Sequence, residues 1–87
     1  DIVMPWPRLF SALEASKLET INVLSVEPNI RAKSFHITAV THPVEEILIY
    51  ISQLKQQDTF TAVSLISTES VRVDGQNATQ FELLVLW

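Results

Sequence analysis

The chain has 87 residues, 47% of them hydrophobic, so it is long enough for one modest core and too apolar for a disordered tail. Its net charge of −4, with the charges scattered, argues against a nucleic-acid-binding surface, which needs a basic face. The absence of cysteine excludes a disulfide framework and a thiolate metal site, and no apolar run reaches the roughly 18 residues that suggest a membrane span. Because the chain opens at Asp1, we interpret residues 1–87 as a single domain excised from a longer protein.

The first predicted element is a helix at residues 6–17. Pro5 and Pro7 suit the first turn of a helix, which tolerates a missing N–H group. Apolar side chains then recur at helical spacing, at Trp6, Leu9, Phe10 and Leu13. The next stretch, INVLSVEP at residues 21–28, is rich in β-branched residues and ends in a Pro-Asn turn, so it predicts a strand.

The clearest strand signal is SFHITAV at residues 34–40, where the side chains alternate with the period of two that is typical of a strand. One face carries Phe35, Ile37 and Ala39, and the other carries His36, Thr38 and Val40. We expect the first face to pack against the helices and the second to point away from them.

The stretch HPVEEILIYISQLKQQ predicts a second helix that ends near residues 57–58. Thr41 or His42 is the expected N-cap, and two glutamates follow in the first turn, where the helix dipole favours negative charge. The apolar stripe consists of Val44, Ile47, Leu48, Ile51 and Leu54. Tyr50 flanks this stripe, whereas Ile49 points away from it, which packing within one domain does not explain.

Two further strands are predicted in the C-terminal third. FTAVSLIS at residues 60–67 is the third strand, and Val71 and Val73 extend its pattern toward a tight turn at Asp74-Gly75. QFELLVLW at residues 80–87 is apolar on both faces, which is typical of a central strand. Its two faces carry Phe81, Leu83, Val85 and Trp87 on one side and Leu84 and Leu86 on the other.

The order helix–strand–strand–helix–strand–strand predicts an α+β fold with two similar halves. Two amphipathic helices can cover one face of a four-stranded antiparallel sheet, which gives a two-layer sandwich. The natural form with this order is a circularly permuted ferredoxin-like fold (αββαββ). Apolar side chains on the uncovered face would indicate a protein partner. With Ile49 on the second helix, the candidate interface residues are His36, Thr38, Ile49, Ile66, Leu84 and Leu86.

The residue pattern gives little support for catalytic or metal chemistry. His36 and His42 match no compact zinc motif, and Glu45 and Glu46 point about 100° apart on a helix. Ser64, Ser67 and Ser70 have no histidine at a motif spacing, and the sequence contains no GxSxG. One glycine, Gly75, cannot build a phosphate-binding loop. We therefore expect no enzymatic activity, no metal site and no cofactor.

The segments PWPRLFSALE, INVLSVEPNIRAKSFHITAVT, YISQLKQQDTFTAVSLIS and FELLVLW follow one another over nearly the whole chain. In this order they resemble the C-terminal periplasmic domain of PilN-type fimbrial assembly proteins, which belong to type IV pilus machines. The resemblance implies a non-enzymatic scaffold on the periplasmic face of the inner membrane, in a pilus or related secretion machine. It also implies a membrane span upstream of this chain, and pairing with itself or with a PilO-type ferredoxin-like domain.

Two other binding functions share this fold class. RNA-recognition domains stack bases on sheet aromatics within a basic field, whereas the predicted open face offers aliphatic side chains and a histidine. A regulatory small-molecule-binding domain of the ACT kind also dimerises. Its site usually lies at a glycine-bearing loop after the first strand, and EPNIRAKS contains no glycine. The ACT-like domain is the alternative function that the sequence leaves open.

Overall fold

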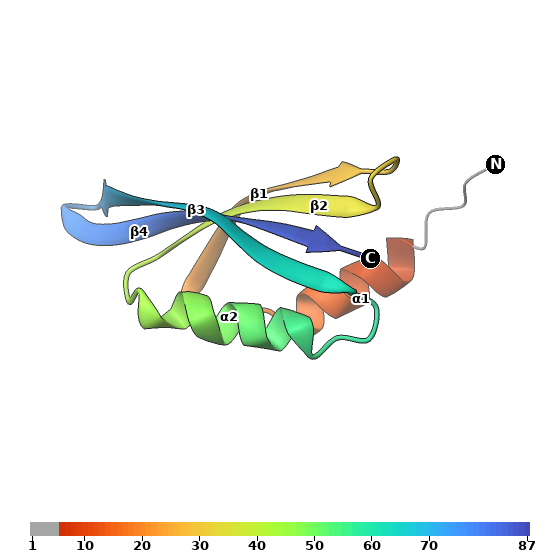
Figure 1. The fold of residues 1–87 in the computed structure, drawn as a ribbon. Coiled ribbons are helices and arrows are strands. Elements are labelled where there is room, and N and C mark those ends of the chain that lie inside the picture. The colour runs from red at the N-terminus through yellow and green to blue at the C-terminus, as the bar shows by residue number, and fades with distance from the viewer. Residues whose placement is uncertain (1–5) are drawn as a thin grey trace.

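The computed structural model describes residues 6–87, and for Trp6 the backbone alone. The predicted helix-start residue Pro5 and the Trp6 side chain lie outside the described part. The elements, shown in Figure 1, are α1 (Trp6–Ala15), β1 (Ile21–Asn29), β2 (Ser34–Thr41), α2 (Glu45–Lys55), β3 (Ala62–Val73) and β4 (Gln76–Leu86). This order confirms the predicted α+β class and the αββαββ sequence of elements.

The four strands form one antiparallel sheet in the order β1-β2-β4-β3. The predicted central position of β4 is confirmed, and β1 and β3 are the two edges. The third strand does extend along Val71 and Val73 to the tight turn, where Asp74 and Gly75 both have positive φ angles. It begins only at Ala62, two residues later than predicted, and Phe60 before it is buried in the core.

Both edge strands carry a β-bulge, and the two bulges lie on either side of one row of residues. This row consists of Ser25, Thr38, Glu82 and Ser67. The extra residues at the bulges are Leu24 in β1 and Ile66 in β3. A bulge bends its strand and interrupts the ladder locally. Each αββ half of the chain therefore contributes one inner strand and one bulged edge strand.

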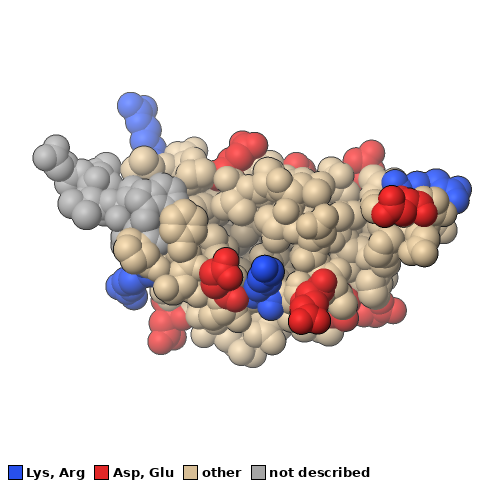
Figure 2. All heavy atoms as spheres, turned by 180° about the vertical axis from the view of Figure 1, so that it is seen from behind, with Lys and Arg blue, Asp and Glu red and all other residues tan. Residues whose placement is uncertain are grey.

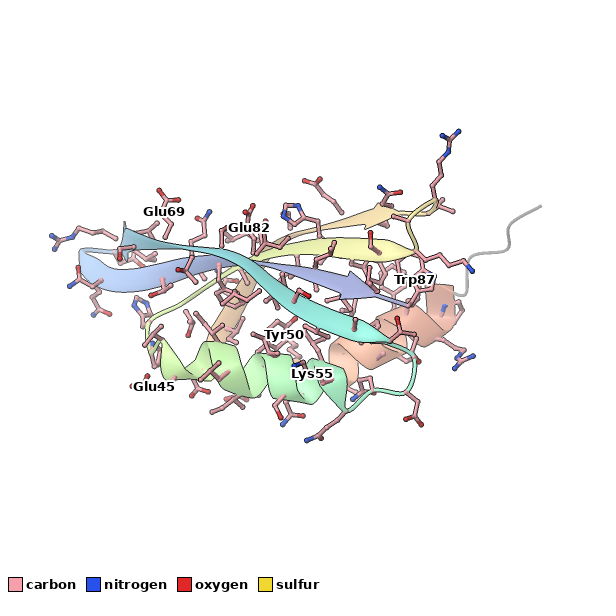
Figure 3. The ribbon with its side chains drawn as sticks, in the orientation of Figure 1. Glu45, Tyr50, Lys55, Glu69, Glu82 and Trp87 are labelled. Atoms are coloured by element: carbon pink, nitrogen blue, oxygen red, sulfur yellow. The ribbon has the colours of Figure 1, made fainter. Side chains whose placement is uncertain are left out.

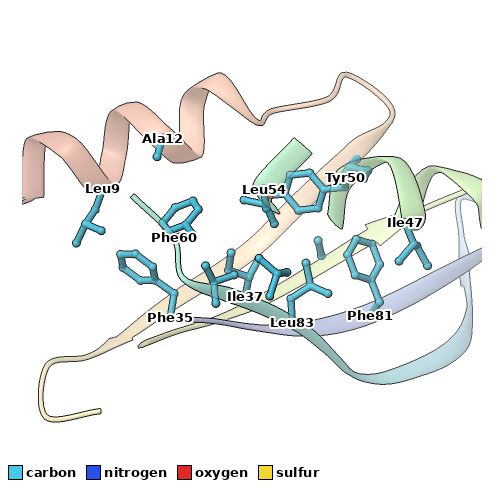
Figure 4. Packing of buried hydrophobic residues seen from close by; sticks show 14 residues of the cluster. Leu9, Ala12, Phe35, Ile37, Ile47, Tyr50, Leu54, Phe60, Phe81 and Leu83 are labelled. Atoms are coloured by element: carbon cyan, nitrogen blue, oxygen red, sulfur yellow. The ribbon is translucent and has the colours of Figure 1, made fainter. Parts of the chain in front are cut away.

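Six side chains of the central strands form the inner layer of the core, and all are fully buried: Phe35, Ile37, Ala39, Phe81, Leu83 and Val85. This confirms the predicted inward faces of β2 and β4. Figure 1 shows α1 and α2 on the same side of the sheet, and Figure 4 shows their side chains over this layer. Aromatic rings pack edge to face within it, with centroids 6.5 Å apart for Phe35 and Phe60 and 6.4 Å for Tyr50 and Phe81.

The N-terminus of α2 differs from the prediction. Val44 occupies the N-cap position and makes no side-chain capping bond, so Thr41 or His42 as the N-cap was wrong. Thr41 is still the last residue of β2, and its hydroxyl donates to the carbonyl oxygen of Thr20 at 3.0 Å, with the Pro43 carbonyl oxygen 3.4 Å away. The hydroxyl therefore ties the start of β1 to the end of β2 instead of capping the helix.

The buried face of α2 is also rotated from the predicted stripe. Ile47, Tyr50 and Leu54 are buried, whereas Leu48 is 70% exposed and Val44 is exposed as well. At about 100° per residue the three buried side chains span only about 60° of the helix. The Tyr50 ring packs edge-on against Phe81, so the buried face of α2 is turned toward Tyr50 and away from Leu48. The predictions that Val44 and Leu48 lie in the core were therefore wrong.

We expect Leu54→Ala to lower the free energy of unfolding by about 2–5 kcal/mol, because it leaves a cavity at a fully buried position. Ile49→Ala, at an exposed position of the same helix, is the matched control and should change it by less than about 0.5 kcal/mol. Ile51, which is partly buried against the core, should give an intermediate loss when changed to alanine. Urea unfolding measures all three, and a loss below about 1 kcal/mol for Leu54→Ala would contradict its place in the core.

Candidate interaction surfaces

The sheet face that points away from the helices is mainly polar. Besides the row of Ser25, Thr38, Glu82 and Ser67, the register aligns Glu27, His36, Leu84 and Ser64 across the four strands. Figure 3 shows Glu69 and Glu82 on this open face, on the opposite side of the sheet from Tyr50. Leu84 and Leu86 also belong to it, but both are half-buried. The open face is therefore more polar and more acidic than the apolar surface that was predicted from Leu84 and Leu86.

The Glu82 carboxylate makes two polar contacts on the open face. The Ser67 hydroxyl donates to Glu82 Oε2 at 2.7 Å, and His36 Nε2 lies 3.4 Å from Glu82 Oε1. The serine proton is thus directed at a carboxylate, whereas an activated serine nucleophile directs its proton at a histidine. The arrangement holds a carboxylate in the middle of the sheet and does not form a catalytic dyad.

The six candidate interface residues do not form one surface. His36, Thr38, Leu84 and Leu86 lie on the open face, as predicted. Ile66 is 52% exposed, but it is the extra residue of the bulge in the edge strand β3. Ile49 is 45% exposed on the outer side of α2, which confirms that it points away from the core. The structure therefore separates a polar face, a strand edge and a helix surface.

Exposed apolar side chains gather at the edges of the sheet. On the strands they occur in β1 and β3 and not in β2 or β4, within residues 6–87. Val23, Val26 and Leu65 pair with buried residues of the inner strands, so they lie on the helix side of the sheet. They remain exposed because the helix layer does not reach the outer margins of the edge strands. Sequence alternation could not reveal this exposure, because these residues follow the same pattern as buried ones.

The two edges differ in how they are protected from pairing. Pro28 lies in β1, where it pairs with Phe35, and proline lacks the N–H group that a further strand would need. β3 spans 12 residues and contains neither proline nor lysine, the residues that commonly guard an edge. Its side chains are exposed from Ser64 to Ser70. β3 is therefore the more open edge.

A groove of about 380 Å³ lies between α1 and β1. Its lining includes Phe10, Leu13, Val23, Val26 and Tyr50. Phe10, predicted on the apolar side of the first helix, is 54% exposed there. Tyr50 is only 3% exposed, and burial raises the pKa of its phenol above the ordinary value of 10.0. Sequence reasoning missed the groove because its lining comes from three separate elements.

The charged side chains form no basic patch on the side of the molecule shown in Figure 2. Individual lysine and arginine side chains are separated there by acidic and uncharged surface. Within residues 6–87, no three His, Asp or Glu side chains are grouped so that they could hold a metal ion. In the same range, no helix has the length and apolarity needed to cross a membrane.

Tyr50 is the only tyrosine, so its ionisation can be followed by tyrosinate absorbance. Because its pKa is raised on folding, the folded state holds the proton more tightly than the unfolded state. Stability from the neutral phenol is therefore fully present below about pH 10 and is lost as the pH rises through the folded pKa. Urea unfolding on both sides of this pH should show the loss in the wild type and a smaller loss in Tyr50→Phe. An equal loss of stability in the wild type and in Tyr50→Phe would show that the Tyr50 phenol is exposed to water.

Searches against protein-family models, curated proteins and solved structures each returned no significant match for this chain.

Proposed function

We propose that this chain is a non-enzymatic interaction domain that pairs with another protein domain through an edge of its sheet. The fold we propose for it is a circularly permuted ferredoxin-like, two-layer sandwich. The strand order β1-β2-β4-β3 supports this fold, because permuting a ferredoxin-like chain to begin with a helix gives this order. The position of both helices on one side of the sheet in Figure 1 also supports it.

The observation that carries the proposal is the open edge β3 with exposed apolar side chains beside it. Unpaired N–H and C=O groups of an edge strand are a template for pairing with another chain. Leu65 and Ile66 add exposed apolar surface at the same edge. An enzyme would need convergent reactive groups, and the one polar cluster of the open face directs its serine proton at Glu82.

The open face is the less favourable route to self-association. Glu27, Glu69 and Glu82 lie on it, and none of the strand residues assigned to it is a lysine or arginine. Face-to-face packing of two copies would bring like charges together and remove them from water, which is costly. Pairing at an edge leaves these carboxylates solvated.

The order of the elements agrees with the PilN-type resemblance, so we propose the same setting for the chain. It acts as a scaffold of the inner-membrane assembly platform of a type IV pilus or related secretion machine, on the periplasmic side. Its partner is a second copy or a PilO-type ferredoxin-like domain. In both cases the partner presents an edge strand of its own.

Sedimentation equilibrium of the chain, alone and mixed with a PilO-type domain, tests this proposal. We expect association in at least one sample, and Leu84→Glu should leave it unchanged, because edge pairing depends on backbone groups and not on the open face. Abolition by Leu84→Glu, in a variant that unfolds in urea like the wild type, would move the contact to the open face. A chain that stays monomeric and ignores the partner would remove the proposed function.

A second function, ligand binding of the ACT kind, is favoured by the groove between α1 and β1. Its size falls within the range of small-molecule sites, roughly 300–1,000 Å³, and its lining is mostly apolar with the Tyr50 phenol among it. It differs from the usual ACT position, which is the loop after the first strand. A ligand here would need an apolar body and a group that accepts or donates one hydrogen bond.

A thermal-shift screen against amino acids distinguishes the two functions. If the groove binds one of them, the melting temperature should rise, and Val23→Trp should abolish the rise by filling the groove. Leu65→Trp, at the opposite edge, is the matched control and should retain it. The interaction domain that we favour predicts no shift with any amino acid.

A further inference from the structure

We propose that the partner is a second copy of this chain, joined by antiparallel pairing of β3 with β3 and by packing of α2 against α2. The inference rests on the proposed function and names its partner and surface. The dimer would have one continuous eight-stranded sheet, because each copy contributes four strands through its open edge. A two-fold axis perpendicular to the sheet relates the copies, so the contact is isologous.

The first argument is the difference between the two edges. β1 carries Pro28, and on the helix side of β1 the surface is hollowed by the groove between α1 and β1. β3 has 12 residues without proline or lysine. In a β3–β3 ladder each residue faces a different residue of the partner, except at the axis itself. The two charged residues of β3, Glu69 and Arg72, therefore meet no like charge unless the axis passes through one of them.

The second argument is the apolar flank of α2. Tyr50 lines the groove beside β1, so that side of α2 faces β1. Leu48 lies about 160° around the helix from Tyr50 and Val44 about 120°, so both lie on the flank toward β3. They are exposed, as is Leu65 on the helix side of β3. An occupant of the β3 edge must therefore supply a strand and, beside it, an apolar helix. A second copy supplies both at the matching spacing, whereas an isolated peptide strand supplies only one.

The third argument is charge complementarity along α2. Glu45 begins the helix and Lys55 ends it, and Figure 3 shows them at opposite ends. Glu45, Leu48 and Lys55 all project from one sector of the helix surface that is less than about 100° wide. The two-fold axis makes the two α2 helices antiparallel, so each Glu45 approaches the partner's Lys55. Two reciprocal ion pairs then close the ends of the apolar contact, and the two helix dipoles oppose each other favourably.

Sedimentation equilibrium and hydrogen exchange of the 87-residue chain test the proposal. We expect a concentration-dependent dimer in which backbone amides of β3 gain protection and those of β1 do not. Leu48→Glu should raise the dissociation constant about tenfold or more by placing two unpaired carboxylates in the contact. Leu24→Glu, at an exposed leucine in the bulge of β1, is the matched control and should leave the constant unchanged, because β1 lies outside the contact.

Two further variants test the strand and the charges separately. Thr68→Lys puts a charge on the exposed edge of β3 and should weaken the dimer, whereas Ser25→Lys, on the edge of β1, should not. Lys55→Glu alone should weaken the dimer, and the double exchange Glu45→Lys with Lys55→Glu should restore it. Restoration would show that these two positions lie opposite each other across the contact, as antiparallel α2 helices place them. Urea unfolding verifies that each variant is folded.

Different failures have different meanings. A dimer that ignores Leu48→Glu and Thr68→Lys but is lost with Ser25→Lys or Leu84→Glu would overturn the β3 contact and leave the proposed interaction function intact. A chain that is monomeric alone but binds a PilO-type domain would overturn the second copy as partner. A chain that does neither would overturn both proposals.

Discussion

The structure depends on one packing constraint, which is the burial of the inward faces of β2 and β4 beneath two short helices. Six side chains from these strands are fully buried there, and Leu9, Ile47 and Leu54 cover them from α1 and α2. Burial of this apolar surface is the main favourable term for so small a domain. Two helices are just enough to cover the central pair of strands. The same arrangement that stabilises the core therefore leaves the outer margins of β1 and β3 exposed.

The two exposed edge strands, β1 and β3, differ in how they are protected against pairing, although they belong to similar halves of the chain. Each carries a bulge beside the same cross-strand row, which bends the strand and limits uncontrolled pairing. β1 has Pro28 in addition, whereas β3 contains no proline. If both edges were open, the domain could add copies at each side and form open-ended assemblies. One guarded and one open edge permit a closed pair.

The open face explains how the domain keeps one side of its sheet in water. Polar and acidic residues alternate with the buried ones along the central strands, and Glu82 is held by Ser67 and His36. Solvated carboxylates resist stacking of this face on another sheet, because their burial without partners is costly. In the proposed dimer the contact is therefore left to the edges, where backbone groups and the apolar flanks of the helices supply it.

The sequence by itself determined the order of elements and the inward faces of the central strands, because alternation and helical spacing are local patterns. It also identified Ile49 as an exposed position and β4 as a central strand. Only the tertiary structure decided that Tyr50 and not Leu48 enters the core, since that choice depends on how the Tyr50 ring meets Phe81 across two elements. The alternation of apolar and polar residues likewise did not predict the bulge at Ile66 or the exposure of Leu65. Which inward-pointing residues are covered depends on where the helices end in space, and that is a property of the assembled fold.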